Sequence, residues 1–306
     1  MMLTGREGDK MTTKNFVCSD IHDDLEALAA FADFAKSQEA DRLLLLGDLS
    51  LRPYTAEALS IAVQTNDVPA FIRAKETHNG KTLSGMKAIL DRSGIQYHVI
   101  PGNYDGSLVK IFGERDLHAR TAQFGGAKVM GYGGADAFPP HIALLVRLGE
   151  ITPFDHQELF DLLKKETPAI GLIHNPPRNL CDDMYNGENV GTPATLRYII
   201  ENHPKLVLSG HIHEAGPNGN NPNGARGIRA VEIDGKKTLV VNPGNLGRFE
   251  IIDEITLATE KQFPYGTFSE VHLEDDGTPT KVAHYSVEER PSRTIGKVRK
   301  LAEYSI

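Results

Sequence analysis

Two histidines, His211 and His213, are separated by a single residue in a turn that directly follows a short apolar segment. That segment, 205–208, is typical of a buried strand. Because both histidines follow the strand end, their side chains can point into one site. Imidazole nitrogens bind divalent transition metals, so the pair indicates a candidate metal site, although many such pairs are ordinary surface or core histidines.

The same arrangement recurs along the chain, because other apolar segments also run into turns that carry metal-binding side chains. These side chains are Asp20 and His22 after 16–18, Asp48 after 42–46, Asn103 after 96–100, and His174 after 169–173. In open α/β sheets, ligands bind beyond the carboxyl ends of the strands, so we expect these residues to converge. Two aspartates, one asparagine and four histidines suit Mn, Fe, Zn or Ni better than Mg or Ca. Seven ligands are too many for one tetrahedral ion, and they suit two ions that share a bridging carboxylate.

The elements that would position these residues alternate between strands and helices in the first part of the chain. A strand at 16–18 precedes a helix that Asp23 or Asp24 can cap, and four consecutive leucines at 43–46 fit a strand covered on both faces. This β-α-β order predicts a layered α/β fold. Further strands are predicted at 96–100, 127–134, 169–173 and 205–208. Helices are predicted over 155–165, over 192–202, and over most of 54–94 with breaks near 67–69 and 78–80.

The last third of the chain has a different pattern, which is richer in strands than in helices. Strands are predicted at 228–233, 238–242, 249–257, 268–274 and 280–287, and Asp234-Gly235 is a hairpin signal. The tail, 293–304, is predicted to be a weak basic helix. We expect residues 1–14 to form a flexible extension and residues 15–306 to form a single domain with two sheets.

Composition and charge exclude several classes of protein. The 306 residues carry a net charge of -8, which makes nucleic acid and anionic membranes unlikely bulk partners. With only two cysteines, Cys18 and Cys181, the chain is not built on disulfides or on Cys-bound zinc, and a reducing, cytoplasmic location is the simplest expectation. No apolar run approaches the ~18 residues that a membrane span needs. The sequence does not indicate the oligomeric state.

With these motifs the chain resembles the calcineurin-like metallophosphoesterase superfamily, in its prokaryotic branch of small predicted phosphoesterases. The resemblance covers about 16–287, and its motifs are Asp20-Ile21-His22, Gly47-Asp48, Gly102-Asn103, His174, and Gly210-His211-Ile212-His213, with further similarity at 131–134, 174–177, 213–214 and 242–244. It implies a four-layer αββα sandwich with two mixed β-sheets. It also implies that one metal is bound by Asp20, His22 and His213, that the other is bound by Asn103, His174 and His211, and that Asp48 bridges both.

The expected reaction is hydrolysis of a small anionic phosphate ester at this dinuclear site, with Mn as the favoured metal. Two close divalent ions lower the pKa of a shared water from ~15.7 toward neutrality and hold the resulting hydroxide as the nucleophile. They also draw charge from the phosphate oxygens. The catalytic residues implied by the resemblance are Asp48, Asn103 and His211.

One residue departs from the family pattern. Many members have a histidine after the motif asparagine, which is thought to help protonate the leaving group or to bind the phosphate, whereas this chain has Tyr104. A tyrosine with its unperturbed pKa of ~10 is a poor general acid at neutral pH, although its hydroxyl can still donate a hydrogen bond to phosphate. Asp105, which would orient that histidine, has no such partner here. We therefore expect slow turnover or a need for good leaving groups, with phosphodiesters favoured over monoesters.

Three further residues are candidates for contact with the substrate: Arg52, Arg178 and His118. Two alternative functions stay open. A nuclease would use the same chemistry but would be expected to have a more basic surface. A catalytically weak scaffold would keep the fold and bind proteins, although scaffolds of this kind tend to lose ligands and this chain has all seven.

Overall fold

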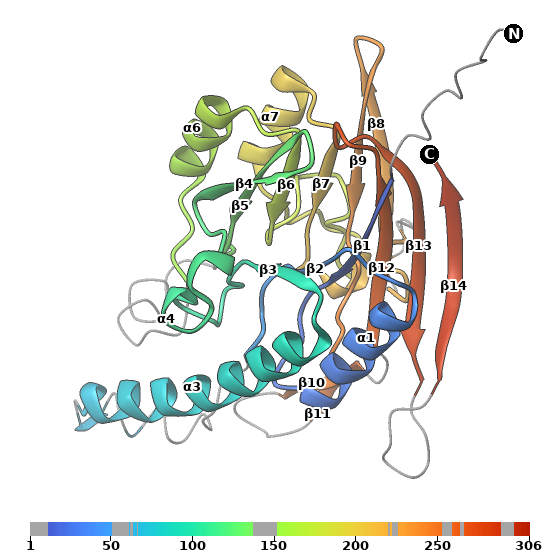
Figure 1. The fold of residues 1–306 in the computed structure, drawn as a ribbon. Helices are drawn as coiled ribbons and strands as arrows, with labels where there is room; N and C mark the ends of the chain where they lie inside the picture. Colours follow the sequence, from blue (N-terminus) through green and yellow to red (C-terminus); the bar gives the residue numbers. More distant parts are fainter. Residues whose placement is uncertain are drawn as a thin grey trace, which may run out of the picture.

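The structure is a computed structural model that describes residues 12–50, 61, 64–65, 67–136, 152–219, 221, 226–252, 259–263, 266–288 and 297–306. Within these residues, two six-stranded sheets lie against each other and helices cover their outer faces, as Figure 1 shows. A small two-stranded sheet consists of β10 (Phe249–Ile252) and β11 (Thr259–Phe263). The predicted αββα sandwich is confirmed.

The first sheet has the strand order β14-β13-β12-β1-β2-β3. Its strands β1, β2 and β3 are parallel, whereas β12 runs antiparallel to β1. The carboxyl ends of the three parallel strands therefore lie side by side. The strands of this sheet are β1 (Thr13–Cys18), β2 (Arg42–Leu45), β3 (Gln96–Val99), β12 (Gly266–Leu273), β13 (Pro279–Val287) and β14 (Val298–Ser305).

The second sheet has the strand order β4-β5-β6-β7-β9-β8. Its four central strands are parallel, and an antiparallel strand closes each edge. The edge strand β4 was not predicted, and neither was β11 in the small sheet. The strands of this sheet are β4 (Arg120–Phe124), β5 (Ala127–Tyr132), β6 (Ile170–Ile173), β7 (Leu206–Leu208), β8 (Ile228–Ile233) and β9 (Lys236–Val241).

The four consecutive leucines of the sequence lie between two different cores. Leu43 and Leu45 pack in the core between the first sheet and its helices, whereas Leu44 and Leu46 pack in the core between the two sheets. All four are buried, and each contributes about 1.5–3 kcal/mol of hydrophobic stabilisation. The run therefore fixes β2 as a central strand that carries Asp48 at its end.

Two helices cover each sheet. The first sheet packs against α1 (Leu25–Ser37) and α3 (Val68–Ser93), and the second packs against α6 (His156–Glu166) and α7 (Pro193–Asn202). Asp24, one of the two predicted caps, accepts a hydrogen bond from the Ala27 amide at the start of α1. Three further helical segments within the described residues are short: α4 (Val109–Phe112) and the 3₁₀ turns η1 (Gly113–Arg115) and η2 (His213–Ala215).

The helix α3 continues through the segment at 78–80, where a break was predicted, so that prediction is wrong. The predicted break near 67–69 is the actual start of the helix, since Asp67 caps it. A glycine inside a helix costs about 1 kcal/mol relative to alanine. Leu83, Met86 and Leu90 bury the following turns against the first sheet, and this packing outweighs the unfavourable Gly80.

The chain end is also different from the prediction, because 298–305 forms the strand β14 and not a helix. It pairs antiparallel with β13 and forms one edge of the first sheet. Charged side chains such as Lys300 and Glu303 lie along it, as is common on edge strands. The open edge of β13 supplies a partner that no local sequence pattern reveals. Within the part of the chain that the structure describes, no helix combines the length and the apolar character needed to cross a membrane.

Candidate metal centre

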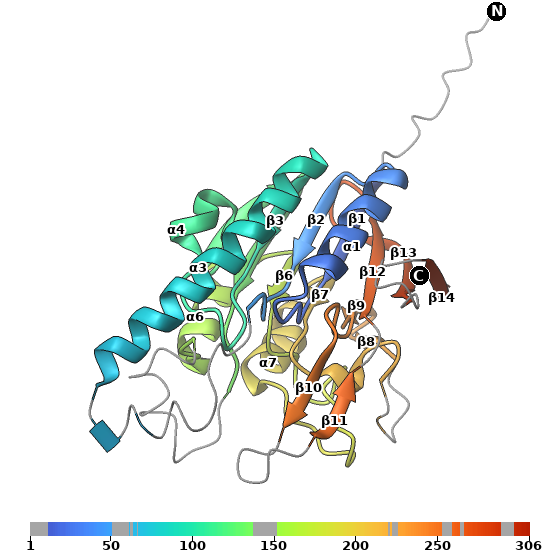
Figure 2. The same cartoon turned by 90° about the horizontal axis from the view of Figure 1, so that it is seen from below.

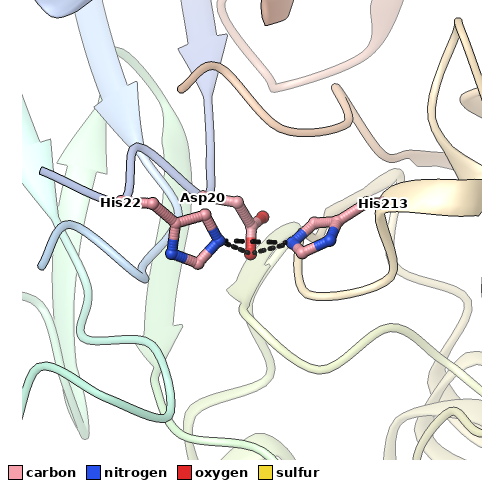
Figure 3. Close-up of side chains that lie close together, drawn as sticks. All are labelled: Asp20, His22 and His213. Carbon is pink, nitrogen blue, oxygen red and sulfur yellow. Dashed lines mark hydrogen bonds and ion pairs between the residues drawn. The ribbon is translucent and has the colours of Figure 1, made fainter. Parts of the chain in front are cut away.

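Three of the predicted ligands, Asp20, His22 and His213, form a first cluster beyond the ends of β1 and β7 (Figure 3). His213 Nε2 lies 3.1 Å from Asp20 Oδ1 and 3.4 Å from His22 Nε2. His22 Nε2 lies 3.9 Å from the same carboxylate oxygen. The two imidazole rings point toward one carboxylate, and the three ligand atoms are close enough to hold a metal ion.

A second cluster consists of Asp48, His174 and His211, together with the amide of Asn103. His174 Nε2 lies 3.7 Å from Asp48 Oδ2. One terminal atom of the Asn103 amide lies 2.9 Å from Asp48 Oδ2 and 3.2 Å from both His174 Nε2 and His211 Nδ1. An amide oxygen at this position faces both carboxylate oxygens of Asp48, and a cation among them would offset this repulsion.

The two clusters are adjacent, because one hydrogen bond joins them directly. The His211 amide, in the second cluster, donates to Asp20 Oδ2 in the first at 3.0 Å. All seven predicted ligands are therefore brought together at one end of the sandwich. His211 and His213 are partly exposed, whereas the other five are buried, so the centre opens on the side of these two histidines.

The turns that carry the predicted ligands hold one another in strained conformations. Asp20, His22, Asp48 and His211 all have positive φ angles, between 48° and 64°. Such a conformation costs about 1–3 kcal/mol for a residue other than glycine. Hydrogen bonds between turns offset this cost: the Asp20 amide donates to Gly47 O at 2.9 Å and the Ile21 amide donates to Asp48 O at 2.8 Å. Turns of both clusters therefore contain strained residues.

Glycines allow the turns to approach this closely. A Cβ atom on Gly102 would lie 2.0 Å from Asp48 Oδ1 and 2.1 Å from the Asp48 amide nitrogen. A Cβ atom on Gly210 would lie 1.8 Å from Ser19 Oγ and 2.8 Å from Asp20 Oδ2. A larger residue at Gly102 would displace Asp48, and one at Gly210 would displace Ser19 and Asp20.

We expect Gly102→Ala to abolish tight metal binding, because the methyl group displaces Asp48. Overpacking of this kind typically lowers the free energy of unfolding by about 1–3 kcal/mol. Mn²⁺ titration calorimetry and urea unfolding measure the two effects. Gly80→Ala is the control, since a Cβ there meets no atom within 4 Å and the change should leave Mn²⁺ binding intact. If the Gly102 variant binds Mn²⁺ as tightly as the original chain, this account of the glycine is wrong.

The charge states of the clusters suit metal binding. Burial lowers the pKa of His22 to about 4 and that of His211 to about 4, so both rings are neutral at pH 7. Burial acts to raise the pKa of Asp20, but the neighbouring His213 outweighs it and the pKa lies below the usual value. The pKa of Asp48 is lowered as well, since His174 outweighs the effect of burial. Neutral imidazoles and ionised carboxylates are the forms that ligate metals.

His174 is the exception among the buried histidines. Burial alone would lower its pKa, but the Asp48 carboxylate and then Asp20 raise it to about 9. Its Nδ1 lies 2.5 Å from Leu46 O, so Nδ1 carries a proton and Nε2 faces the second cluster. In the metal-free protein Nε2 is therefore protonated as well, and the positively charged ring lies next to the carboxylates of Asp48 and Asp20. The donor set of both clusters fits divalent transition metals, which would replace that charge.

Asp105, a tentative catalytic residue from the sequence, lies behind the second cluster. Its carboxylate accepts hydrogen bonds from the backbone amides of Gly102 (2.7 Å), Ser50 (2.8 Å) and Leu49 (3.1 Å). Burial, and then repulsion by Asp48, raise its pKa to about 6. In this position Asp105 joins the turn that carries Asp48 to the turn that carries Asn103.

Tyr104 and the three candidate substrate contacts differ in how close they lie to the clusters. The Tyr104 amide donates to Asp48 Oδ1 at 3.1 Å and its side chain is half-buried, so this residue adjoins the second cluster. His118 accepts a hydrogen bond from the Gly133 amide and packs on the Tyr132 ring. Arg178 is exposed, four residues beyond His174. Arg52 lies outside the described residues.

Two residues at the centre were not singled out as candidates from the sequence. The ring of Phe263, at the end of β11, lies 5.0 Å from the His213 ring, and no local pattern links these two positions. Asn242, after β9, donates to carbonyl groups of the turn that carries His211 and His213. Asn242 lies directly after a predicted strand, as the ligands do, and within the stretch of family similarity at 242–244, and these were the available signals.

Comparison with known proteins identifies similar sequences and structures. The model of a family described as calcineurin-like phosphoesterase matches residues 14–215. No curated protein matches the chain. One solved structure has a TM-score of 0.57 at 18% identity, over 83% of this chain and 100% of that chain. A dimetal phosphatase from Danio rerio has a TM-score of 0.51 at 9% identity, over 94% and 98%. At such identities the solved structures establish the fold alone.

Proposed function

Because the chain belongs to the calcineurin-like phosphoesterase family, we propose that it hydrolyses small anionic phosphate esters at a centre of two divalent metal ions, with phosphodiesters favoured over monoesters. The observation that carries this proposal is the pair of adjacent clusters, each with three ligand atoms within 4.8 Å of one another. The Danio rerio structure of similar fold is described as a dimetal phosphatase, which supports two ions here too.

The proposed ligand roles follow the two clusters. Asp20, His22 and His213 would hold one ion, Asn103, His174 and His211 would hold the other, and Asp48 would be shared between them. When bound, the ions supply positive charge to the phosphate oxygens and lower the pKa of a coordinated water. Mn²⁺ is the favoured metal, since the donor set combines nitrogen with hard oxygen ligands.

The residues around the clusters orient the ligands. Leu46 O fixes the His174 ring through Nδ1, so Nε2 stays directed at the second cluster. The backbone amides on Asp105 keep the Asp48 and Asn103 turns at a constant separation. The substrate approaches on the open side, where His211, His213 and Tyr104 are partly exposed.

Tyr104 is the reason for proposing phosphodiesters with good leaving groups. It lies where a histidine would assist the leaving group, and its hydroxyl is too weak an acid for that role at neutral pH. A monoester carries one more negative charge than a diester, so its hydrolysis depends more strongly on a group that protonates the leaving group.

We expect Tyr104→His to increase kcat/KM about tenfold or more for esters with poor leaving groups, because a general acid is added. For esters of p-nitrophenol, kcat/KM should change little, because p-nitrophenolate departs without a proton. Comparison of p-nitrophenyl with alkyl esters in Tyr104→His and in a Tyr104→Phe control measures the difference. An unchanged rate on alkyl esters would show that Tyr104 does not limit turnover.

The test of the proposed function is an assay of the purified chain with added Mn²⁺ on bis(p-nitrophenyl) phosphate and on p-nitrophenyl phosphate. We expect hydrolysis of both, faster for the diester, with complete loss in excess EDTA. Cleavage of DNA with a steep salt dependence, and no cleavage of the small diester, would favour a nuclease. Two bound ions without hydrolysis of either ester would favour a scaffold.

A further inference from the structure

The side chain of Asn242 is completely buried directly after β9, at the base of the metal centre. Its amide nitrogen lies within hydrogen-bonding distance of three backbone carbonyl oxygens, those of Ile212 (3.0 Å), Cys181 (3.2 Å) and Gly210 (3.3 Å). Its amide oxygen accepts a hydrogen bond from the Gly244 amide at 2.9 Å. One side chain thus joins the turn after β7 to the loop that follows β6.

Two of these carbonyl groups belong to the residues on either side of His211. His211 itself has a φ of 64°, in the left-handed region that is unfavourable for a residue with a side chain. Its amide is held from the other direction, because it donates to Asp20 Oδ2. Asn242 therefore fixes the peptide group that joins Gly210 to His211 and the one that joins Ile212 to His213, and Asp20 holds the nitrogen of the first of them.

The same contacts determine where His213 lies. Ile212 O, which accepts from Asn242, also accepts from the Ala215 amide at 3.2 Å and so starts the short turn η2 that carries His213. Gly210 has no space to move toward the first sheet, since Ser19 and Asp20 already lie against it. Movement of the turn away from Asn242 would displace both histidines.

We propose that Asn242 is a positioning residue that places His211 and His213 in the two clusters, so that a single side chain sets the geometry of both metal ions. The inference rests on the proposed function, since it concerns the same centre. Asn242 touches neither ion nor substrate in this account. It acts through the backbone of the histidine turn.

The chemistry of the contact requires an amide. Aspartate has the same shape, but its carboxylate only accepts hydrogen bonds and would face three carbonyl oxygens. Asn242→Asp therefore replaces attraction with repulsion at constant volume, and Asn242→Ala removes the donors without adding a charge. Outer contacts of this kind typically change metal affinity about 10–100-fold.

A matched control exists at the opposite end of the first sheet. Asn15 in β1 is also completely buried, and its amide nitrogen donates to Thr13 O (3.2 Å) and Val271 O (3.3 Å). Arg42 lies 3.5 Å from the Asn15 side-chain oxygen, and none of these contacts involves a predicted ligand, so Asn15→Asp should leave the centre unaffected. Any general effect of losing a buried amide is common to both positions.

The experiment compares Co²⁺ binding by the original chain, Asn242→Asp, Asn242→Ala and Asn15→Asp, together with urea unfolding in EDTA. Visible absorption of bound Co²⁺ reports ligand geometry independently of activity. We expect two ions in the original chain and in Asn15→Asp with the same spectrum, and affinity about 10–100-fold weaker with a changed spectrum in both Asn242 variants. Unchanged affinity and spectrum in either folded Asn242 variant would overturn the inference, as would equal losses in Asn15→Asp. Failure of the original chain to bind Co²⁺ would instead overturn the proposed function, and this inference with it.

Discussion

Asp48→Asn is expected to reduce phosphoester hydrolysis about 1,000-fold or more and to leave at most one tightly bound ion per chain. The change keeps the size of the side chain but removes the negative charge that lies between the clusters. Asp48 Oδ2 is 3.7 Å from His174 Nε2 and 2.9 Å from the Asn103 amide, so an asparagine disturbs the second cluster directly. Bound metals supply several kcal/mol of transition-state stabilisation, and each 1.36 kcal/mol corresponds to a factor of about ten in rate.

This prediction is tested by measuring the number of bound metal ions and the rate of ester hydrolysis on the same samples. Asp116→Asn is a suitable control, since Asp116 is buried but contacts the His118 amide rather than a predicted ligand. The control should keep two ions and most of the activity. An Asp48→Asn protein with two tightly bound ions and undiminished activity would rule out the bridging role.

The affinity of the second cluster for Mn²⁺ is expected to rise about tenfold for each pH unit between pH 7 and 8.5. His174 has a pKa of about 9 in the metal-free protein, so it is protonated over this range and must lose one proton to bind through Nε2. His22 and His211, with pKa values of about 4, are already neutral and release none. Affinity therefore increases with pH and levels off near pH 9.

Calorimetric titration in two buffers with different ionisation enthalpies counts the released protons. We expect about one proton per chain from His174 at pH 7.5. A His98→Gln variant is the control, because His98 lies on β3 away from the clusters and should leave this count unchanged. Mn²⁺ affinity that is constant from pH 7 to 8.5 would show that His174 is neutral without metal or does not bind it.

Most of the centre could be predicted because its residues follow strands with strong apolar patterns. The run at 43–46 identifies a central strand, and parallel strands bring their carboxyl ends together, so Asp20, Asp48 and Asn103 converge. The sequence also distinguishes Asp24 as one of two possible caps for α1, and the structure selects it.

What could not be predicted depends on contacts between distant segments. The tail became β14 because β13 offers an open edge, and Asp105, for which the sequence indicates no histidine partner, binds the backbone amides of Ser50 and Gly102. Asn242 acts on a turn about 30 residues before it. Figure 2 shows β10 and β11 side by side, apart from the two six-stranded sheets, and only the fold brings the Phe263 ring to 5.0 Å from the His213 ring.

The central claim is that two metal ions lie in the two clusters, and anomalous diffraction from crystals of the Mn²⁺-loaded protein tests it most directly. The account predicts two Mn peaks, one among Asp20, His22 and His213 and one among Asn103, His174 and His211, with Asp48 between them. A single peak, or peaks elsewhere in a fully loaded crystal, would contradict it.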